Sequence, residues 1–157
     1  MRMSLGENMV VTLFGESHGP AVGALIEGMP ANTKLDVDQL IADMISRRPG
    51  SGLASKRKET DDVEILSGVN DGKTTGMPIL LLIKNRDVKS KDYSFLPYQP
   101  RPGHVDHPIS VKTGGAADLR GGGSFSARLT AGLVAAASIS RNILPKEWKI
   151  EATVGAL

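Results

Sequence analysis

The stretch Met9-Val10-Val11-Thr12-Leu13-Phe14-Gly15-Glu16-Ser17-His18-Gly19-Pro20 decides the fold. Its apolar first half predicts a strand over 9–14, and the apolar run over 21–27 predicts a second strand. A sharp, glycine-bounded turn between two strands indicates an antiparallel pair. The turn also holds the side chains of Ser17 and His18 at the end of a strand, where binding and catalytic groups are often found.

The rest of the chain mixes helix and strand patterns without regular alternation, which predicts an α+β fold in a single domain over 1–157. Asp36 can cap the first helix, with Gln39 in the capping-box position. We expect helices over 37–46 and 126–144, strands over 63–66, 77–84 and 149–157, a turn at 70–72 and an irregular loop over 85–103. The strand over 77–84 is apolar without alternation, which is typical of burial on both faces. The expected buried face of the last helix consists of Leu129, Leu133, Val134, Ala137, Ser140 and Leu144.

The composition is that of a soluble globular protein, with 40% hydrophobic and 23% charged residues in 157. A net charge of +2 is too small to indicate a nucleic-acid partner. Cysteine is absent, which excludes disulfides and thiolate metal sites and fits a reducing cytoplasm. No apolar block is long enough to cross a membrane. We therefore expect a cytoplasmic protein with a small-molecule partner.

Two further polar loops share the character of the first turn. Three glycines precede the last expected helix, where inward-turned amides and the helix start favour an anion. Ser124 and Ser126 add hydroxyl donors there, and Arg128 can grip an anion with two hydrogen bonds. His18 and His104 each lie in a glycine-bounded loop and could transfer protons near neutral pH. A flexible loop with a capped helix and two surface histidines remain the simpler alternatives.

Two basic segments also have two interpretations. Arg47 and Arg48 end the first expected helix, where cations complement the helix dipole, and 56–58 could be a solvated basic patch. Together they would suit a small substrate with several negative charges.

Three local motifs are misleading. The segment 15–19 fits the G-x-S-x-G pattern of hydrolases, but that elbow needs a helix immediately after the serine, and a strand is expected here. The segment 72–74 resembles part of a P-loop without its first glycine or its helix. Pro108 interrupts a helical pairing of His104 and His107, so we expect no metal site.

Taken in chain order, these motifs resemble the chorismate synthase family, over nearly the whole chain. The resemblance is carried by Gly15-Glu16-Ser17-His18-Gly19, Glu27-Gly28-Met29-Pro30, Arg47-Arg48-Pro49-Gly50, Ser67-Gly68-Val69, Gly72-Lys73-Thr74-Thr75-Gly76, Ser90-Lys91-Asp92-Tyr93, Arg101-Pro102-Gly103-His104-Val105-Asp106, and Gly121-Gly122-Gly123 with Ser126-Ala127-Arg128.

This resemblance implies a lyase of the shikimate pathway, in aromatic amino acid biosynthesis. The reaction is a 1,4-elimination that turns 5-enolpyruvylshikimate 3-phosphate into chorismate and phosphate. It implies reduced FMN as cofactor, so the protein would be a flavoprotein, and in some members NADPH (NADP) reduces the flavin. It also implies a β-α-β sandwich of the chorismate synthase type and a homotetramer, with no nucleic-acid or membrane partner.

By position in the family motifs, the resemblance makes His18 the catalytic histidine beside the flavin and His104 the histidine that protonates the departing phosphate. Substrate contacts fall on Ser17, Arg47, Arg48, Arg101 and Arg128. Cofactor contacts fall on Ser124, Phe125, Ser126, Ala127 and Arg47, the last through the nicotinamide nucleotide.

Family members are roughly twice as long as this chain, and their second half supplies further FMN contacts and a catalytic aspartate. We therefore expect residues 1–157 to form the N-terminal half of the sandwich, with the C-terminal half absent and no turnover by this chain alone. A non-catalytic module that binds an anion or a flavin is the alternative function. A serine hydrolase is a third, distant one.

Overall fold

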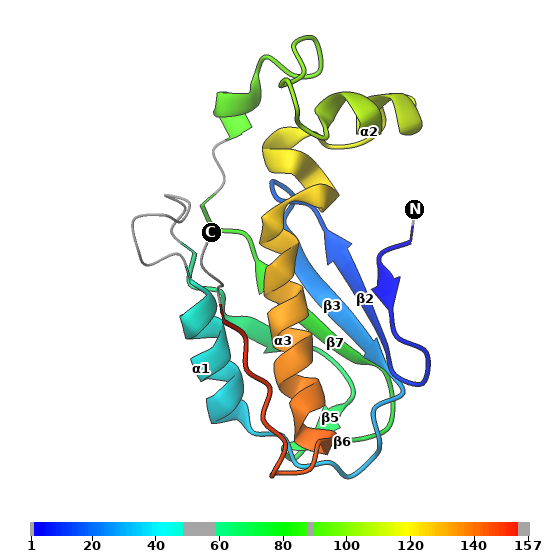
Figure 1. The fold of residues 1–157 in the computed structure, drawn as a ribbon, viewed down its shortest axis with the longest axis vertical. Coiled ribbons are helices and arrows are strands. Elements are labelled where there is room, and N and C mark those ends of the chain that lie inside the picture. Colours follow the sequence, from blue (N-terminus) through cyan, green and yellow to red (C-terminus); the bar gives the residue numbers. More distant parts are fainter. Residues whose placement is uncertain (1, 49–58, 88–89, 154–157) are drawn as a thin grey trace.

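A computed structural model describes residues 2–48, 59–87 and 90–153. Its main sheet has five antiparallel strands in the order β1-β2-β3-β7-β4. Two helices, α1 and α3, cover one face of this sheet (Figure 1). The strands are β1 (Ser4–Leu5), β2 (Val10–Gly15), β3 (Ala21–Glu27), β4 (Val63–Ile65) and β7 (Ile79–Lys84). The expected α+β mixture is therefore confirmed.

The turn of the opening stretch joins β2 and β3, as expected. The two strands pair antiparallel from Val10 opposite Glu27 to Gly15 opposite Val22. A separate hairpin joins β5 (Val69–Asn70) and β6 (Lys73–Thr74). Its two-residue loop, Asp71-Gly72, has φ values of 47° and 72°, which is the backbone of a type I′ turn.

The core lies between the sheet and α3 (Thr130–Ser140). Six strand residues with no exposed surface face this helix: Val22, Ala24, Ile26, Ile79, Leu81 and Ile83. Small side chains on α3 let the helix approach the sheet closely. A Cβ on Gly132 would lie 2.5 Å from the carbonyl oxygen of Gly23, so this crossing requires glycine.

Helix α1 (Val37–Arg47) begins as expected, because the Asp36 side chain accepts a hydrogen bond of 2.9 Å from the Gln39 amide. In a capping box the Gln39 side chain would accept a hydrogen bond from the Asp36 amide, but a residue distant in sequence takes this place. The Asp36 amide donates instead to Oδ1 of Asn142, at 2.9 Å. Asn142 lies in a 3₁₀ turn, η4 (Arg141–Ile143), that extends α3. The start of one helix is thus fixed by the end of the other.

Four expectations about local structure were wrong. Strand β7 alternates: Leu81 is fully buried, whereas Leu80 and Leu82 are half-buried on the other face. On α3 the buried face consists of small residues with Ile139, and Leu133 is exposed. An unexpected helix, α2 (Asp106–Lys112), accommodates Pro108 in its first turn, where a proline costs no hydrogen bond. No strand forms over 149–153, and 154–157 lie outside the described residues.

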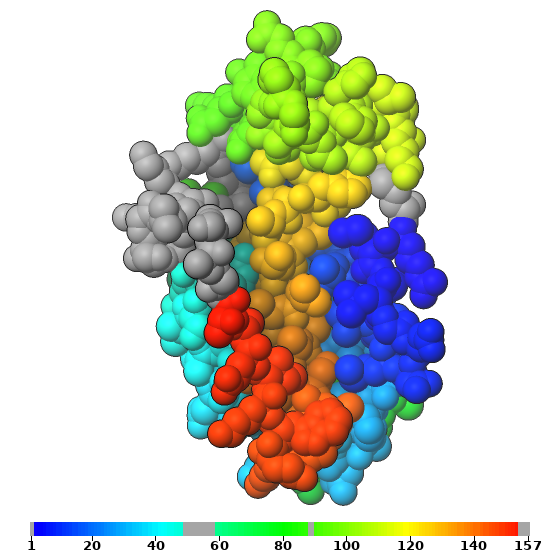
Figure 2. Space-filling model, viewed as in Figure 1, coloured from blue at the N-terminus to red at the C-terminus, as the bar shows by residue number. Residues whose placement is uncertain are grey.

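The segment over 90–125 forms a cap at one end of the sheet (Figure 1). It contains η1 (Ser90–Tyr93), α2 and the 3₁₀ turn η2 (Arg120–Phe125), and it leads through η3 (Ala127–Leu129) into α3. The β2–β3 turn reaches the same end of the sheet, beneath this cap (Figure 1). At the other end of the chain, the tail over 144–153 lies on the outer surface across the helices (Figure 2). The fold therefore brings the expected polar loops to one end of the molecule.

Candidate active site

The triple-glycine turn of η2 lies against the β2–β3 turn. Its glycines have φ values of 58°, 87° and 53°, a left-handed backbone that excludes most other residues. The carbonyl oxygen of Gly123 accepts a hydrogen bond of 3.0 Å from the Ser17 amide, and the Ser124 hydroxyl donates to the carbonyl of Gly15 at 3.1 Å. Two hydrogen bonds therefore join two loops that are more than 100 residues apart in sequence.

Both candidate histidines contact this turn. A Cβ on Gly121 would lie 2.6 Å from Nδ1 and Cε1 of His18, and 2.7 Å from the Ser17 hydroxyl. A Cβ on Gly122 would lie 3.6 Å from Cε1 and 3.9 Å from Nε2 of His104. The two imidazoles thus flank neighbouring glycines, and the structure brings them to one site.

His104 is held by a buried carboxylate. Its Nδ1 lies 2.7 Å from Oδ1 of Asp106, whose side chain has no exposed surface. The same carboxylate accepts two hydrogen bonds from the guanidinium of Arg101, at 2.7 and 2.8 Å, and a third from the Arg101 amide at 3.1 Å. The Arg101 side-chain bonds hold the pKa of Asp106 well below its usual range, so this carboxylate is ionised at neutral pH.

The ring of Tyr93 lies between the two histidine environments. The Arg101 guanidinium lies over this ring, 5.4 Å from its centre. The His18 imidazole meets the same ring edge-on, with 4.8 Å between the ring centres. A continuous chain of contacts therefore runs from His104 through Asp106, Arg101 and Tyr93 to His18.

A second buried carboxylate pairs with two of the candidate arginines. Asp61, 2% exposed, accepts from Nη1 of Arg47 at 2.5 Å and makes a short ion pair with Nη1 of Arg128. Arg47 ends α1, and its Nη2 also donates to the Thr130 hydroxyl at 3.3 Å. Arg128 is itself buried, with 7% of its surface exposed. These two arginines form a cluster around Asp61, separate from the contact chain that includes Arg101.

Asn85 links this arginine cluster to the β2–β3 turn that carries Ser17 and His18, here called the histidine turn. Its Oδ1 accepts from Nε of Arg128 at 2.9 Å. Its side-chain amide donates to the carbonyls of Glu16 and Gly19, at 3.0 and 2.8 Å. Asn85 directly follows β7, so the end of this strand holds the backbone on both sides of Ser17 and His18.

The negative charge of the carboxylates in the site nearly balances the positive charge of its arginines. Arg120 makes two hydrogen bonds to Asp118, at 2.8 and 2.9 Å, and these lower the pKa of that carboxyl. Together with Asp61 and Asp106, this gives three carboxylates beside Arg47, Arg101, Arg120 and Arg128, a net charge of +1. A polyanion entering the site would compete with these carboxylates for the guanidinium groups.

The remaining candidate residues lie around this arrangement. Ser17 is 3% exposed. Arg48 makes a loose ion pair with Asp62, at 3.8 Å, and the two side chains are 37% and 58% exposed. Phe125 and Ala127 are exposed next to the glycine turn, while the Ser126 hydroxyl accepts from the Arg128 amide and caps η3. The basic segment 56–58 lies outside the described residues.

Sequence reasoning missed the partners of these cations. Asp106 was part of a family motif but was given no role, and Asp61 and Asp118 stood in no motif that would single them out among 17 Asp and Glu residues. Asn85 carried no motif either. Asp106 and Asp118 each lie within five residues of the arginine they bind, and this spacing could have suggested a pair. Asp61 and Tyr93 reach the site only through the tertiary fold.

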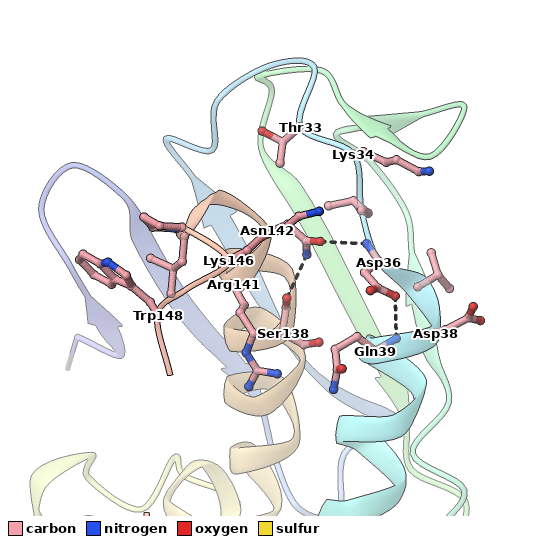
Figure 3. A pocket seen from close by; sticks show the side chains of 14 residues that line it. Thr33, Lys34, Asp36, Asp38, Gln39, Ser138, Arg141, Asn142, Lys146 and Trp148 are labelled. Atoms are coloured by element: carbon pink, nitrogen blue, oxygen red, sulfur yellow. Dashed lines mark hydrogen bonds between the residues drawn. The ribbon is translucent and has the colours of Figure 1, made fainter. Parts of the chain in front are cut away.

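An open groove of about 960 Å³ lies at the opposite end of the helices (Figure 3). Figure 3 shows Asn142 bridging Asp36 and Ser138 within it. The polar groups of Asp36 and Asn142 are thus used in holding α1 and α3 together, and none of the candidate site residues lines this groove. The groups suited to chemistry therefore lie at the histidine end.

Within 2–48, 59–87 and 90–153, no helix combines the length and the apolar character that crossing a bilayer requires.

Comparison with known proteins identifies a family. The chain is 51% identical over 145 residues to a chorismate synthase of Aeropyrum pernix, covering 92% of this chain and 38% of that protein. It is 50% identical over 149 residues to the enzyme of Ralstonia pickettii, covering 94% and 40%. The chain thus spans about 40% of the length of these relatives.

A solved structure described as a crystal structure of chorismate synthase matches the fold with a TM-score of 0.60 and 30% identity, over 87% of this chain and 33% of that one. A family model described as chorismate synthase matches residues 9–157. The chain belongs to the chorismate synthase family.

Proposed function

We propose that this chain supplies the phosphate-eliminating part of a chorismate synthase active site, acting on 5-enolpyruvylshikimate 3-phosphate. The observation that carries the proposal is the contact of both imidazoles, His18 and His104, with neighbouring glycines of one turn. Two proton-transfer groups beside one left-handed turn can serve a single small substrate.

The arginines suit a substrate with one phosphate and two carboxylates. Arg101 pairs with the carboxylate that holds His104, Arg120 directly precedes the glycine turn, and Arg47 and Arg128 share Asp61. We propose that Arg101 and Arg128 bind substrate oxygens, with Arg47 and Arg48 at the edge of the same site. Each guanidinium already has a carboxylate partner, so its orientation is set before the substrate arrives.

His104 is proposed to donate a proton to the departing phosphate oxygen. The carbon–oxygen bond breaks with its electron pair moving to the phosphate, and the proton from the imidazolium neutralises part of the new charge. His18 packs edge-on against Tyr93, with 4.8 Å between the ring centres, and is proposed to hold a proton beside the cofactor. Ser17, at the base of the same turn, is proposed to contact the substrate.

Reduced FMN is the cofactor that the family implies, and the residues here fit a planar ring system. Phe125 is 43% exposed beside the glycine turn, and the neighbouring Ser124, Ser126 and Ala127 are small. We propose that these four residues contact the flavin. When bound, reduced FMN supplies the electron-rich group that the elimination requires without net redox change.

Further family properties belong to the same proposal. NADPH would reduce the flavin, with Arg47 near the nucleotide, and the working protein would be a cytoplasmic homotetramer. Light scattering of the purified protein measures the oligomeric state, and anaerobic NADPH oxidation in the presence of FMN measures the reductase activity.

A non-catalytic module that binds an anion or a flavin is the second candidate. The carboxylate partners of all four arginines favour it, because an already balanced site can bind without completing a reaction. Such a module would bind the substrate or FMN and release no product. A serine hydrolase is disfavoured, because β3 and not a helix follows Ser17.

The test joins residues 1–157 to the C-terminal remainder of the Aeropyrum pernix relative. The chimera is incubated anaerobically with FMN, dithionite and substrate, and chorismate is followed by absorbance. We expect product, and we expect His104→Ala to lower turnover by about 100-fold or more while substrate binding changes little.

His107→Ala is the matched control, because this exposed imidazole lies three residues from His104, in α2, and its replacement is expected to leave turnover unchanged. A folded chimera whose turnover survives His104→Ala would remove His104 from the reaction. Binding without any product would favour the non-catalytic module.

A further inference from the structure

Asp106 is the one fully buried carboxylate among the described residues that contacts a candidate catalytic histidine. Its Oδ1 lies 2.7 Å from Nδ1 of His104, and both oxygens are engaged by Arg101. Asp106 is the first residue of α2, a helix whose buried Ile109 anchors it to the molecule. Helix backbone therefore fixes the carboxylate, and the carboxylate in turn orients the imidazole.

We propose that Asp106 is a positioning residue that keeps a proton on Nδ1 of His104, so that Nε2 is the nitrogen that exchanges protons with the site. This rests on the proposed function of His104. A carboxylate that is ionised accepts hydrogen bonds and donates none. Nδ1 must then be the donor in both the neutral and the charged imidazole.

The geometry around the ring agrees with this assignment. The Nε2 side of His104 faces Gly122, where a Cβ would be 3.9 Å from Nε2. Because Gly122 carries no side chain, the position beside Nε2 that a Cβ would occupy is left open. Transfer of the Nε2 proton from the imidazolium to a phosphate oxygen then leaves a neutral ring, whose Nδ1–H still donates its hydrogen bond to Asp106.

The groups that face His104 from neighbouring elements support a fixed charge arrangement. Asp106 comes from α2, Arg101 from the preceding loop, and Tyr93 from η1 lies beneath Arg101. The Arg101 side-chain bonds hold the pKa of Asp106 low, so the carboxylate stays an acceptor over the neutral range. One buried carboxylate thereby sets the tautomer of His104 and the position of Arg101 over the ring that meets His18.

Asp106→Asn tests whether the carboxylate sets the tautomer of His104, because asparagine has nearly the same size as aspartate but can donate a hydrogen bond. Arg101 can only donate, so the single oxygen of the asparagine is expected to pair with it, and the amide nitrogen then faces His104. An amide N–H donates to Nδ1 and favours the neutral tautomer with the proton on Nε2. The same replacement in serine-protease triads produces the wrong tautomer by this mechanism.

The experiment is long-range ¹H–¹⁵N NMR of the three histidines in the chain, above pH 8, where ordinary imidazole is neutral. His104→Gln assigns the signals. We expect the Nδ1–H pattern for His104 in the unmodified chain and the Nε2–H pattern in Asp106→Asn. Asp43→Asn is the control, because it removes a comparable carboxylate from Arg141, 3.2 Å away, far from His104.

An Nε2–H pattern for His104 in the unmodified chain would overturn the proposal even if the variant does not fold. An unchanged pattern in a folded Asp106→Asn chain would overturn it as well. These measurements require no turnover. A tautomer change without elimination by the chimera would therefore refute the proposed function and leave the positioning role intact.

Discussion

Replacing Gly121 by alanine tests the contact between the glycine turn and the histidine turn. The added methyl group would lie 2.6 Å from the His18 ring and 2.7 Å from the Ser17 hydroxyl, well inside ordinary van der Waals distance. The backbone there has φ +58°, which costs an alanine about 1 kcal/mol. Overpacking adds about 1–3 kcal/mol.

Gly72→Ala is the matched control. Gly72 has φ +72°, and no atom lies within 4 Å of the position that a Cβ would take, so its substitution carries the backbone cost alone. The difference between the two variants therefore isolates the packing of the two turns. In urea unfolding, the free energy of unfolding of Gly121→Ala should be about 1–3 kcal/mol lower than that of Gly72→Ala.

The His18 side chain has little room to escape, because its ring meets Tyr93 edge-on. The NMR signals of the His18 ring should therefore move in Gly121→Ala and stay in place in Gly72→Ala. Equal unfolding free energies within about 0.5 kcal/mol, with unchanged His18 signals, would show that the two turns are not in contact.

Three further changes test other parts of the structure. Asp61→Asn should lower the free energy of unfolding by about 3 kcal/mol, because it leaves the two guanidinium groups without their shared carboxylate. The exposed Asp62→Asn should cost less than about 0.5 kcal/mol, and similar losses for the two variants in urea unfolding would contradict the cluster. Gly132→Ala should lower the melting temperature although alanine favours a helix by about 1 kcal/mol, because its Cβ would meet the Gly23 carbonyl; a rise would refute the close crossing. The folded-state pKa of Asp106 lies below the unfolded value of about 3.9, so its contribution to stability is fully present above about pH 5 and is lost as the pH falls through the folded pKa. The unfolding free energy should therefore fall less steeply with decreasing pH in Asp106→Asn than in the unmodified chain. Identical slopes for the two proteins would contradict the ion pair.

Local signals predicted the elements that depend on local chemistry. The hairpin at Gly15–Pro20 follows from glycine-bounded polar residues between apolar runs, and the start of α1 follows from the cap at Asp36. Glycine-bounded polar loops also predicted His18 and His104 as candidate proton-transfer residues, and the structure brings both rings to neighbouring glycines of one turn.

Features that depend on close approach could not be predicted in the same way. The pattern of large apolar residues pointed to Leu133, but α3 buries its small side chains because they let the helix reach β3. Pro108 argued against a helix, yet it occupies a first turn, where no hydrogen bond is lost. Asp61 precedes β4, whereas its partners Arg47 and Arg128 lie in α1 and η3, so only the tertiary fold brings the three side chains together.

The central claim is that His18 and His104 flank one site for a small polyanion. The most direct measurement is a titration of the chain with 5-enolpyruvylshikimate 3-phosphate, followed by the ¹H–¹³C signals of its histidine rings. We predict that the signals of His18 and His104 shift together with one dissociation constant, while the exposed His107 does not respond. Separate dissociation constants for the two rings, or a response of only one, would contradict a shared site.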